Sequence, residues 1–278
     1  MRLPLDRARH AALFELLDEL ERLGAPAVLV GGLVPPLLLD HLDPDASLAA
    51  PEPRRTADCD LVAHVSHGAP DAYDAVLRFL EARWARDRLA NQFRWVHVSG
   101  LRVDLIPVPA GIEAGDPAAL AFAARVSLNV DVAEFHHGQE YAIASALLVN
   151  VDDLGGGRRP IRVAGLVAML ALKLRAWTDS QRDRRRDAHD IVWLLRYVST
   201  ALAVDELVVA RREQPTLVTG IVTALARDFA DAWALGVRHY VAEAFPERYR
   251  LPDDEAESER LAAAYAVQRV LARYAAFG

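Results

Sequence analysis

The sequence predicts an α+β fold, in which an N-terminal α/β half with a mixed β-sheet flanked by helices is followed by a C-terminal helical bundle. The short apolar runs that we interpret as buried strands all lie in the N-terminal half. The run Gly155-Gly156-Gly157 is the clearest linker in the chain. Beyond it, apolar residues recur at helical spacing. We therefore expect two domains, residues 1–155 and 156–278.

The elements of the N-terminal half follow from hydrophobic period and from turn residues. Helices are predicted over 6–23, 33–42, 70–86 and, weakly, 117–125. Strands are predicted over 27–30, 58–65, 93–98 and 101–108, with strand-like pieces near 141–151. Ser99-Gly100 indicates a hairpin turn between two of these strands. Residues 43–55 contain three prolines and are predicted to form a loop.

The C-terminal half is predicted to be helical throughout. The predicted helices cover 164–177, 184–198, 216–244 and 255–276. We interpret the acidic stretch 253–259 as the solvated start of the last helix. We therefore expect residues 156–278 to form a helical domain that completes the site described below.

Composition limits the functions that the chain can have. The chain has 278 residues, a hydrophobic fraction of 53% and a formal net charge of −7, which excludes global disorder and an overall positive field for nucleic acid. Binding of RNA would need a local basic patch. The lone Cys59 excludes an internal disulfide framework. Without a signal peptide or an apolar run long enough to span a bilayer, we expect a soluble cytoplasmic protein with no membrane partner.

Carboxylates on two predicted strands form the strongest candidate site. Asp58 and Asp60 are two apart on one strand, so they share a face, while Cys59 points the other way. Asp104 lies on another strand and points away from its apolar neighbours. Adjacent carboxylates repel each other and are best tolerated around a divalent cation. Three of them could hold two metal ions in the geometry of in-line phosphoryl transfer.

A diglycine step, Gly31-Gly32, lies between a predicted strand and a predicted helix start. Without side chains, the step lets a phosphate approach backbone N–H groups and the positive end of the helix. This placement predicts a phosphate-binding turn upstream of the carboxylates.

A second charged cluster follows in the helical half. Of the 32 basic residues, 31 are arginine, and the only lysine is Lys173. Lysine is a compact point charge suited to a triphosphate, and arginine does not replace it freely. An arginine-rich turn follows, and Asp187 and Asp190 then share one helix face. The alternative interpretation of this segment is a solvated helix–turn–helix whose charges pair with each other.

Together these motifs resemble the nucleotidyltransferase superfamily of DNA polymerase beta, with its Gly-Gly or Gly-Ser turn, D-x-D strand and third aspartate. The stretch KLRA at 173–176 and RDAHDIVWL at 186–194 narrow the resemblance to AbiEii-type nucleotidyltransferases, toxins of bacterial toxin–antitoxin systems. The resemblance covers roughly residues 25–196. The sequence departs from the family in having Gly32 where serine is usual and in the long loop at 43–55.

The resemblance implies a metal-dependent enzyme that uses an NTP and Mg²⁺ or Mn²⁺, with a cognate antitoxin and the 3′ end of tRNA as expected partners. Asp58 and Asp60 would hold the metals, and Asp104 would bind the second metal and help deprotonate the acceptor. The expected nucleotide-binding residues are Gly31, Gly32, Arg54, Thr56, Lys173 and Arg182. Either Asp187 or Asp190 would be the further functional aspartate.

Two other functions remain open from the sequence. The same chemistry could modify a cationic small molecule such as an aminoglycoside, which suits an acidic protein, or a protein side chain. A non-catalytic scaffold of the same fold is the third hypothesis, and it predicts no nucleotide turnover.

Overall fold

The computed structural model describes residues 3–51, 56, 58–66, 70–87, 93–110, 132–153, 155–178, 184–245 and 252–277. The chain divides into two compact units. The first consists of Met1–Val34 and Arg55–Gly165, and the second of Pro35–Arg54 and Leu166–Gly278. This division differs from the expected boundary at residue 155 in two places. The second unit includes a segment from the N-terminal third of the chain, and the first unit continues ten residues past the expected boundary.

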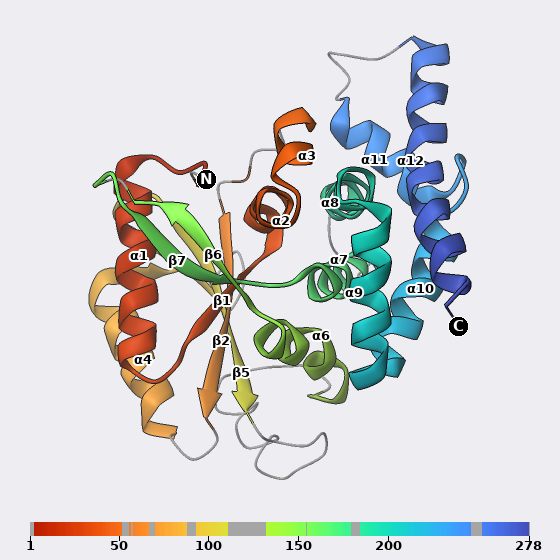
Figure 1. The fold of residues 1–278 in the computed structure, drawn as a ribbon. Helices are drawn as coiled ribbons and strands as arrows, with labels where there is room; N and C mark the ends of the chain where they lie inside the picture. Colours follow the sequence, from red (N-terminus) through yellow and green to blue (C-terminus); the bar gives the residue numbers. More distant parts are fainter. Residues whose placement is uncertain are drawn as a thin grey trace. The chain divides into compact units, whose positions relative to one another are not determined.

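The first unit contains a mixed sheet with helices on both faces (Figure 1). Its helices are α1 (Arg7–Arg22), α4 (Pro70–Arg83) and α6 (Val132–Ala144), with a 3₁₀ turn, η1, at Gly31–Leu33. Its strands are β1 (Ala27–Val30), β2 (Asp58–Ser66), β3 (Trp84–Arg86), β4 (Arg94–His97), β5 (Arg102–Ala110), β6 (Leu147–Asp152) and β7 (Arg158–Val163). The predicted fold class is confirmed.

The seven strands lie in the order β3-β4-β5-β2-β1-β7-β6. The pairs β2–β5 and β1–β7 are parallel, and the other pairs are antiparallel. Helices α1 and α4 cover one face of the sheet, and α6 packs on the other against β1, β2 and β5 (Figure 1). The central strands β1 and β2 are buried between these layers because both of their faces are covered.

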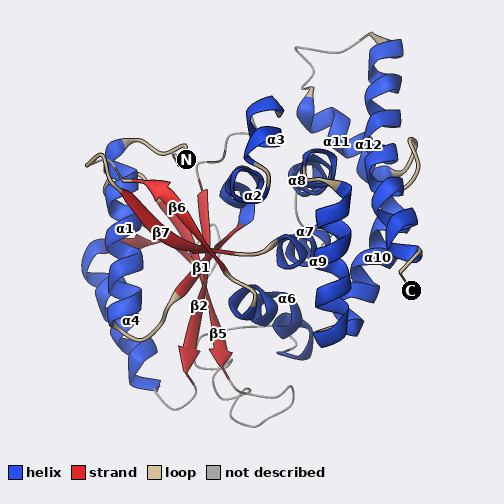
Figure 2. Cartoon of the chain, in the orientation of Figure 1, coloured by secondary structure: helices blue, strands red, loops and turns tan. Residues whose placement is uncertain are grey.

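The described part of the second unit contains only helices and loops (Figure 2). These helices are α2 (Val34–Leu42), α3 (Pro44–Ala49), α7 (Leu166–Thr178), α8 (Arg184–Tyr197), α9 (Thr200–Glu213), α10 (Pro215–Phe229), α11 (Leu235–Ala244) and α12 (Asp253–Ala275). Helix α8 is central to its core, since it packs against α7, α11 and α12. No helix in the described ranges combines the length and the hydropathy that a bilayer crossing requires.

Two predictions were wrong where a local signal outweighed the general pattern. The predicted loop at 43–55 contains helix α3, because Asp43 accepts a hydrogen bond from the Ala46 N–H (3.0 Å) and Pro44 occupies the first turn. The predicted helix over 70–86 ends at Arg83, and residues 84–86 form strand β3 against β4.

The prediction near the expected linker was also wrong. Residues 141–144 end helix α6, and only 147–152 form a strand. The triple glycine is the turn of the hairpin β6–β7, in which the N–H of Asp153 donates to the Gly157 carbonyl (2.8 Å). A glycine run indicates a change of chain direction, and period alone does not separate a hairpin turn from a linker. The weak helix at 117–125 lies outside the described residues.

The half predicted to be helical throughout begins with a strand, β7, and its helices differ from their prediction in two further ways. Helix α9, capped by Ser199, was missed. The predicted helix over 216–244 is two helices, α10 and α11, separated by a turn in which the Asp231 side chain accepts from the Trp233 N–H (2.7 Å). An aspartate that bonds to a nearby backbone N–H competes with the helix and ends it without glycine or proline.

Candidate active site

The two aspartates of β2 lie on one face of the strand, as predicted. Cys59 and Leu61 are fully buried on the other face, while Asp58 and Asp60 are half-buried. Alternation along the strand is the cause, since successive side chains of a strand point to opposite faces.

The register of the sheet brings the third carboxylate beside this pair. Strands β2 and β5 are parallel neighbours, with Asp60 opposite Asp104 and Asp58 opposite Arg102. Neighbouring strands lie about 4.8 Å apart, and opposed residues of a parallel pair point to the same face. The three aspartates that the sequence singled out are therefore neighbours on one face of the sheet. We call Asp58, Asp60 and Asp104 the carboxylate cluster.

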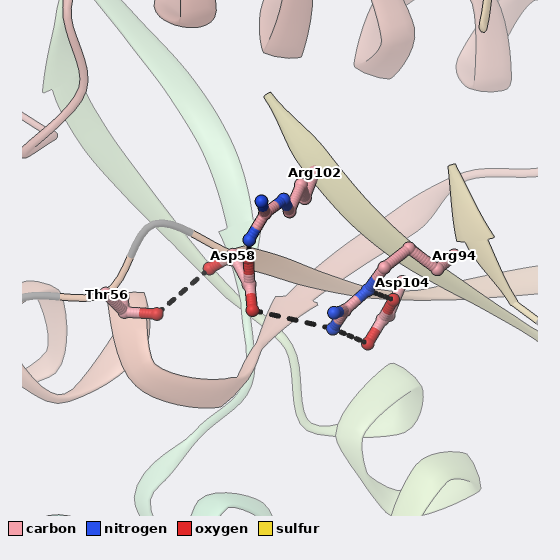
Figure 3. Close-up of polar contacts among 5 residues, drawn as sticks. All are labelled: Thr56, Asp58, Arg94, Arg102 and Asp104. Carbon is pink, nitrogen blue, oxygen red and sulfur yellow. Dashed lines mark hydrogen bonds and ion pairs between the residues drawn. The ribbon is translucent and has the colours of Figure 1, made fainter. Parts of the chain in front are cut away.

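An arginine on the next strand, β4, is hydrogen-bonded to the carboxylate of Asp104. In Arg94, Nε donates to Oδ1 of Asp104 and Nη2 to Oδ2, each at 2.8 Å, and Nη2 also lies 3.5 Å from Oδ2 of Asp58 (Figure 3). This two-pronged geometry is the strong form of an arginine–carboxylate pair. The hydrogen bonds to Asp104, with the charges of the cluster, raise the pKa of Arg94, so it stays positively charged.

Sequence reasoning missed Arg94, although a signal was present. Strands β4 and β5 pair with Trp95 opposite Val103 and Arg94 opposite Asp104. A tight hairpin turn at Ser99-Gly100 sets this register, because turn length fixes which residues of the two strands are opposed. Counting outward from the turn would have placed an arginine beside the third aspartate.

The Asp58 carboxylate contacts two arginines without a close hydrogen bond. Its Oδ2 contacts Arg94, and its Oδ1 lies 3.9 Å from Nη1 of Arg102 (Figure 3). Among the described residues, this Oδ1 is buried without a hydrogen-bond partner. Thr56 donates its hydroxyl to the Asp58 carbonyl oxygen at 3.3 Å, so it supports the start of β2. A buried carboxylate oxygen that accepts no hydrogen bond is costly, and coordination to a cation would offset that cost.

The diglycine step lies against the cluster. Gly31 has φ +77°, and an added Cβ would be 1.9 Å from Oδ2 and 2.9 Å from Cβ of Asp60. The antiparallel pairing of β1 with β2 holds Val30 opposite Asp60 and so fixes this approach. The space that the missing side chain leaves at Gly31 is therefore filled by the Asp60 side chain. Gly32 is buried within η1.

The cluster fits a divalent cation in part. Carboxylate oxygens are the ligands that Mg²⁺ prefers, and it commonly uses one or two of them. Asp58 and Asp60 can supply these ligands. Both oxygens of Asp104, however, accept from Arg94. Consistently, no three His, Cys, Asp or Glu side chains converge on a metal-binding point within the part of the chain that the structure describes.

Cys59 is expected to be unreactive in the folded protein. Complete burial, followed by the negative charges of Asp60, Asp104 and Asp58, raises its pKa well above the usual value, and only the thiolate is nucleophilic. Iodoacetamide at pH 8 should therefore leave the native chain unlabelled by mass spectrometry and should label it fully in urea. Stoichiometric labelling of the native chain would contradict the burial of this face of β2.

In the second unit, the only lysine is paired with two aspartates. Nζ of Lys173 on α7 lies 2.7 Å from Oδ2 of Asp190 and 3.2 Å from Oδ1 of Asp187, both on α8. The Lys173 side chain is 10% exposed and that of Asp190 only 3%. Nδ1 of His189 lies 3.6 Å from the other oxygen of Asp190. The structure thus brings together Lys173 and both candidate aspartates. The predicted positions Arg54 and Arg182 lie outside the described residues.

Comparison with known proteins gives one extensive match. A family model described as "Nucleotidyl transferase AbiEii toxin, Type IV TA system" matches residues 18–268. No curated protein matches the sequence. Among solved structures, the crystal structure of an antigenic nucleotidyltransferase-like protein from Paracoccidioides brasiliensis is 16% identical. The alignment covers 76% of this chain and 92% of that chain, with a TM-score of 0.38.

Proposed function

The chain belongs to the AbiEii nucleotidyl transferase toxin family, and from this premise we propose that it moves an NMP from an NTP to a hydroxyl of the tRNA 3′ end with the help of Mg²⁺ or Mn²⁺. That it is a nucleotidyltransferase follows from the family. The family also implies an NTP substrate and an antitoxin partner. The metal, the tRNA acceptor and a cytoplasmic location are parts of the proposal.

The observation that carries the proposal is the register of β2 and β5, which puts Asp104 beside Asp60, on the face that Asp58 shares. Three acidic side chains on one face of adjacent strands are costly unless positive charge comes to them. We assign Asp58 and Asp60 to hold a divalent cation and Asp104 to complete its site. When bound, the cation supplies positive charge to the phosphate oxygens on which negative charge develops.

The residues of the chain then have the following roles. The acceptor hydroxyl oxygen forms a bond to the α-phosphorus, the bond from that phosphorus to pyrophosphate breaks, and Asp104 takes the hydroxyl proton. Positioning of the phosphates is assigned to Gly31, Gly32, Thr56, Arg54, Lys173 and Arg182. Lys173 and the aspartates beside it are assigned to the reaction because they form part of the family motif. Lys173 would supply positive charge to the triphosphate.

A tRNA acceptor is supported by the family resemblance and by the arginine-rich segment 182–186, most of which forms the first turn of α8. Arginines occupy positions 182, 184, 185 and 186, and such a local excess of positive charge attracts phosphate even in an acidic protein. The net charge of −7 favours a cationic small molecule instead. These two observations favour different acceptors, so the acceptor has to be identified by a transfer assay.

The test is transfer of label from each of the four NTPs, labelled at the α-phosphate, to total bacterial tRNA in the presence of Mg²⁺. We expect label on tRNA with the native chain and only background with Asp58→Ala. Asp254→Ala removes an exposed carboxylate at the start of α12 and is the matched control, which should retain full transfer. Circular dichroism checks that both variants are folded.

The outcomes separate the acceptors. Label on tRNA that Asp58→Ala loses supports the whole proposal. Pyrophosphate release with an aminoglycoside or a protein acceptor, but none with tRNA, overturns the tRNA part and leaves the nucleotidyltransferase. Full transfer by Asp58→Ala overturns the assignment of the carboxylate cluster.

A further inference from the structure

Arg94 binds Asp104, a side chain that would have to be accessible in order to bind a metal ion. Its guanidinium donates to both oxygens of Asp104 and also contacts Oδ2 of Asp58 (Figure 3). Its side chain is only 19% exposed, so water screens these contacts weakly. A cation that binds Asp104 must coordinate at least one of the two carboxylate oxygens, and both of these accept hydrogen bonds from Arg94 in the structure.

The charges explain why the chain keeps an arginine there. Without a cation, three carboxylates on one face repel one another. Arg94 and Arg102 bring two positive charges to them. The guanidinium therefore does for the cation-free protein what the divalent cation does for the loaded one. The two cannot both occupy Asp104 in full.

We propose that Arg94 is a positioning residue that competes with the divalent cation for Asp104, and that this competition sets the cation affinity of the carboxylate cluster. The inference rests on the proposed function, since it takes the cluster as the cation site. In the cation-free protein Arg94 holds Asp104 with both oxygens. Binding of the cation at Asp104 releases one or both N–H groups of Arg94.

Arg102 is a natural comparison, because it differs from Arg94 in contact rather than in charge. Its Nη1 lies 3.9 Å from Oδ1 of Asp58, and its side chain is 55% exposed. It makes none of the hydrogen bonds to Asp104 that the structure gives to Arg94. If only the charge near the cluster mattered, the loss of either arginine would change cation affinity to a similar degree.

The first measurement is Mn²⁺ affinity, read from the loss of the free-ion electron paramagnetic resonance signal on titration of the full chain without nucleotide. We expect Arg94→Gln to bind Mn²⁺ on the order of tenfold more tightly than the native chain, because hydrogen bonds to a charged group no longer have to be broken. Arg94→Lys, which keeps the charge without the two-pronged contact, should lie between them. Arg102→Gln should change the affinity clearly less than Arg94→Gln.

The second measurement follows Arg94 itself. In the native chain labelled with ¹⁵N at arginine, the Nε resonance that is absent from Arg94→Lys belongs to Arg94. Titration with diamagnetic Mg²⁺ should shift this resonance as its bond to Asp104 breaks. This measurement keeps the test decisive if Arg94→Gln folds poorly, a property checked by thermal unfolding.

The outcomes distinguish failure of the inference from failure of the proposed function. Asp60→Asn should abolish Mn²⁺ binding, and if it does not, the proposed cation site is wrong. If Asp60→Asn abolishes binding but Arg94→Gln binds no more tightly than Arg102→Gln, only the competition is overturned. Mg²⁺ binding that leaves the Arg94 resonance unmoved also overturns it. If neither the native chain nor Arg94→Gln binds Mn²⁺, both fall.

Discussion

Replacing Gly31 by alanine is expected to destabilise the chain by about 2–5 kcal/mol and to abolish nucleotide transfer. The φ of +77° costs an L-residue roughly 1–2 kcal/mol. The added Cβ would also overlap the Asp60 side chain, 1.9 Å from Oδ2, and such overpacking costs about 1–3 kcal/mol. Rotation of the carboxylate does not relieve the overlap, because Cβ of Asp60 is itself 2.9 Å away. Urea unfolding and the tRNA label assay measure the two effects.

Gly24→Ala is the matched control for this variant. Gly24 has a similar φ of +73°, but an added Cβ would meet nothing within 4 Å. It should therefore lose only the roughly 1–2 kcal/mol due to the backbone and keep its transfer activity. Equal stability losses in the two variants, with transfer retained in both, would show that Asp60 does not lie against Gly31.

The candidate site shows which features a sequence reveals. The alternation of β2 and the order of the motifs were enough to identify Asp58, Asp60 and Asp104 as a group, because strand period is local. The family expected from these motifs is confirmed by the match over residues 18–268. That match also extends well beyond residue 196, where the motifs that we recognised end. The C-terminal helices, which carry no such motif, thus belong to the family pattern.

Features that depend on pairing between segments were harder to predict. The contact of Arg94 with Asp104 requires the register of a hairpin, and the contact of Gly31 with Asp60 requires that β1 pair with β2. The first contact follows from the length of one turn and the second from pairing between segments about thirty residues apart, so composition alone reveals neither. The same reason applies to the triple glycine, which closes the hairpin β6–β7. Whether a glycine run turns or links depends on whether the segments on either side pair with each other.

The pairing of Lys173 gives a second reason for its being lysine. From composition alone, a single lysine among 31 arginines indicated a phosphate ligand. The structure shows Nζ within 3.2 Å of both Asp187 and Asp190, and a compact ammonium fits between two helices more readily than a planar guanidinium. Loss of activity in a Lys173 variant would therefore not by itself assign the residue to the nucleotide. Stability has to be measured in the same variant.

We expect Lys173→Met to destabilise the chain by about 3–5 kcal/mol, because it leaves Asp190 buried without its positive partner. The side chain of Asp190 is 3% exposed, so water cannot replace the lost ammonium. Arg175→Met removes a positive charge from an exposed position of the same helix. That control should change the free energy of unfolding by no more than about 1 kcal/mol, the range of an exposed polar or ionic contact. Urea unfolding at constant pH and ionic strength compares the variants.

The double variant Lys173→Met with Asp190→Asn separates the structural role of the Lys173–Asp190 pair from its role in transfer. Replacing a buried ion pair by neutral groups is commonly close to neutral for stability, so the double variant should recover most of the free energy that Lys173→Met loses. If Lys173 or Asp190 also takes part in transfer, tRNA labelling should stay at background even though the fold is restored. Recovery of both stability and transfer would limit Lys173 to the packing of α7 on α8. A Lys173→Met chain as stable as Arg175→Met would show that the buried pair does not form.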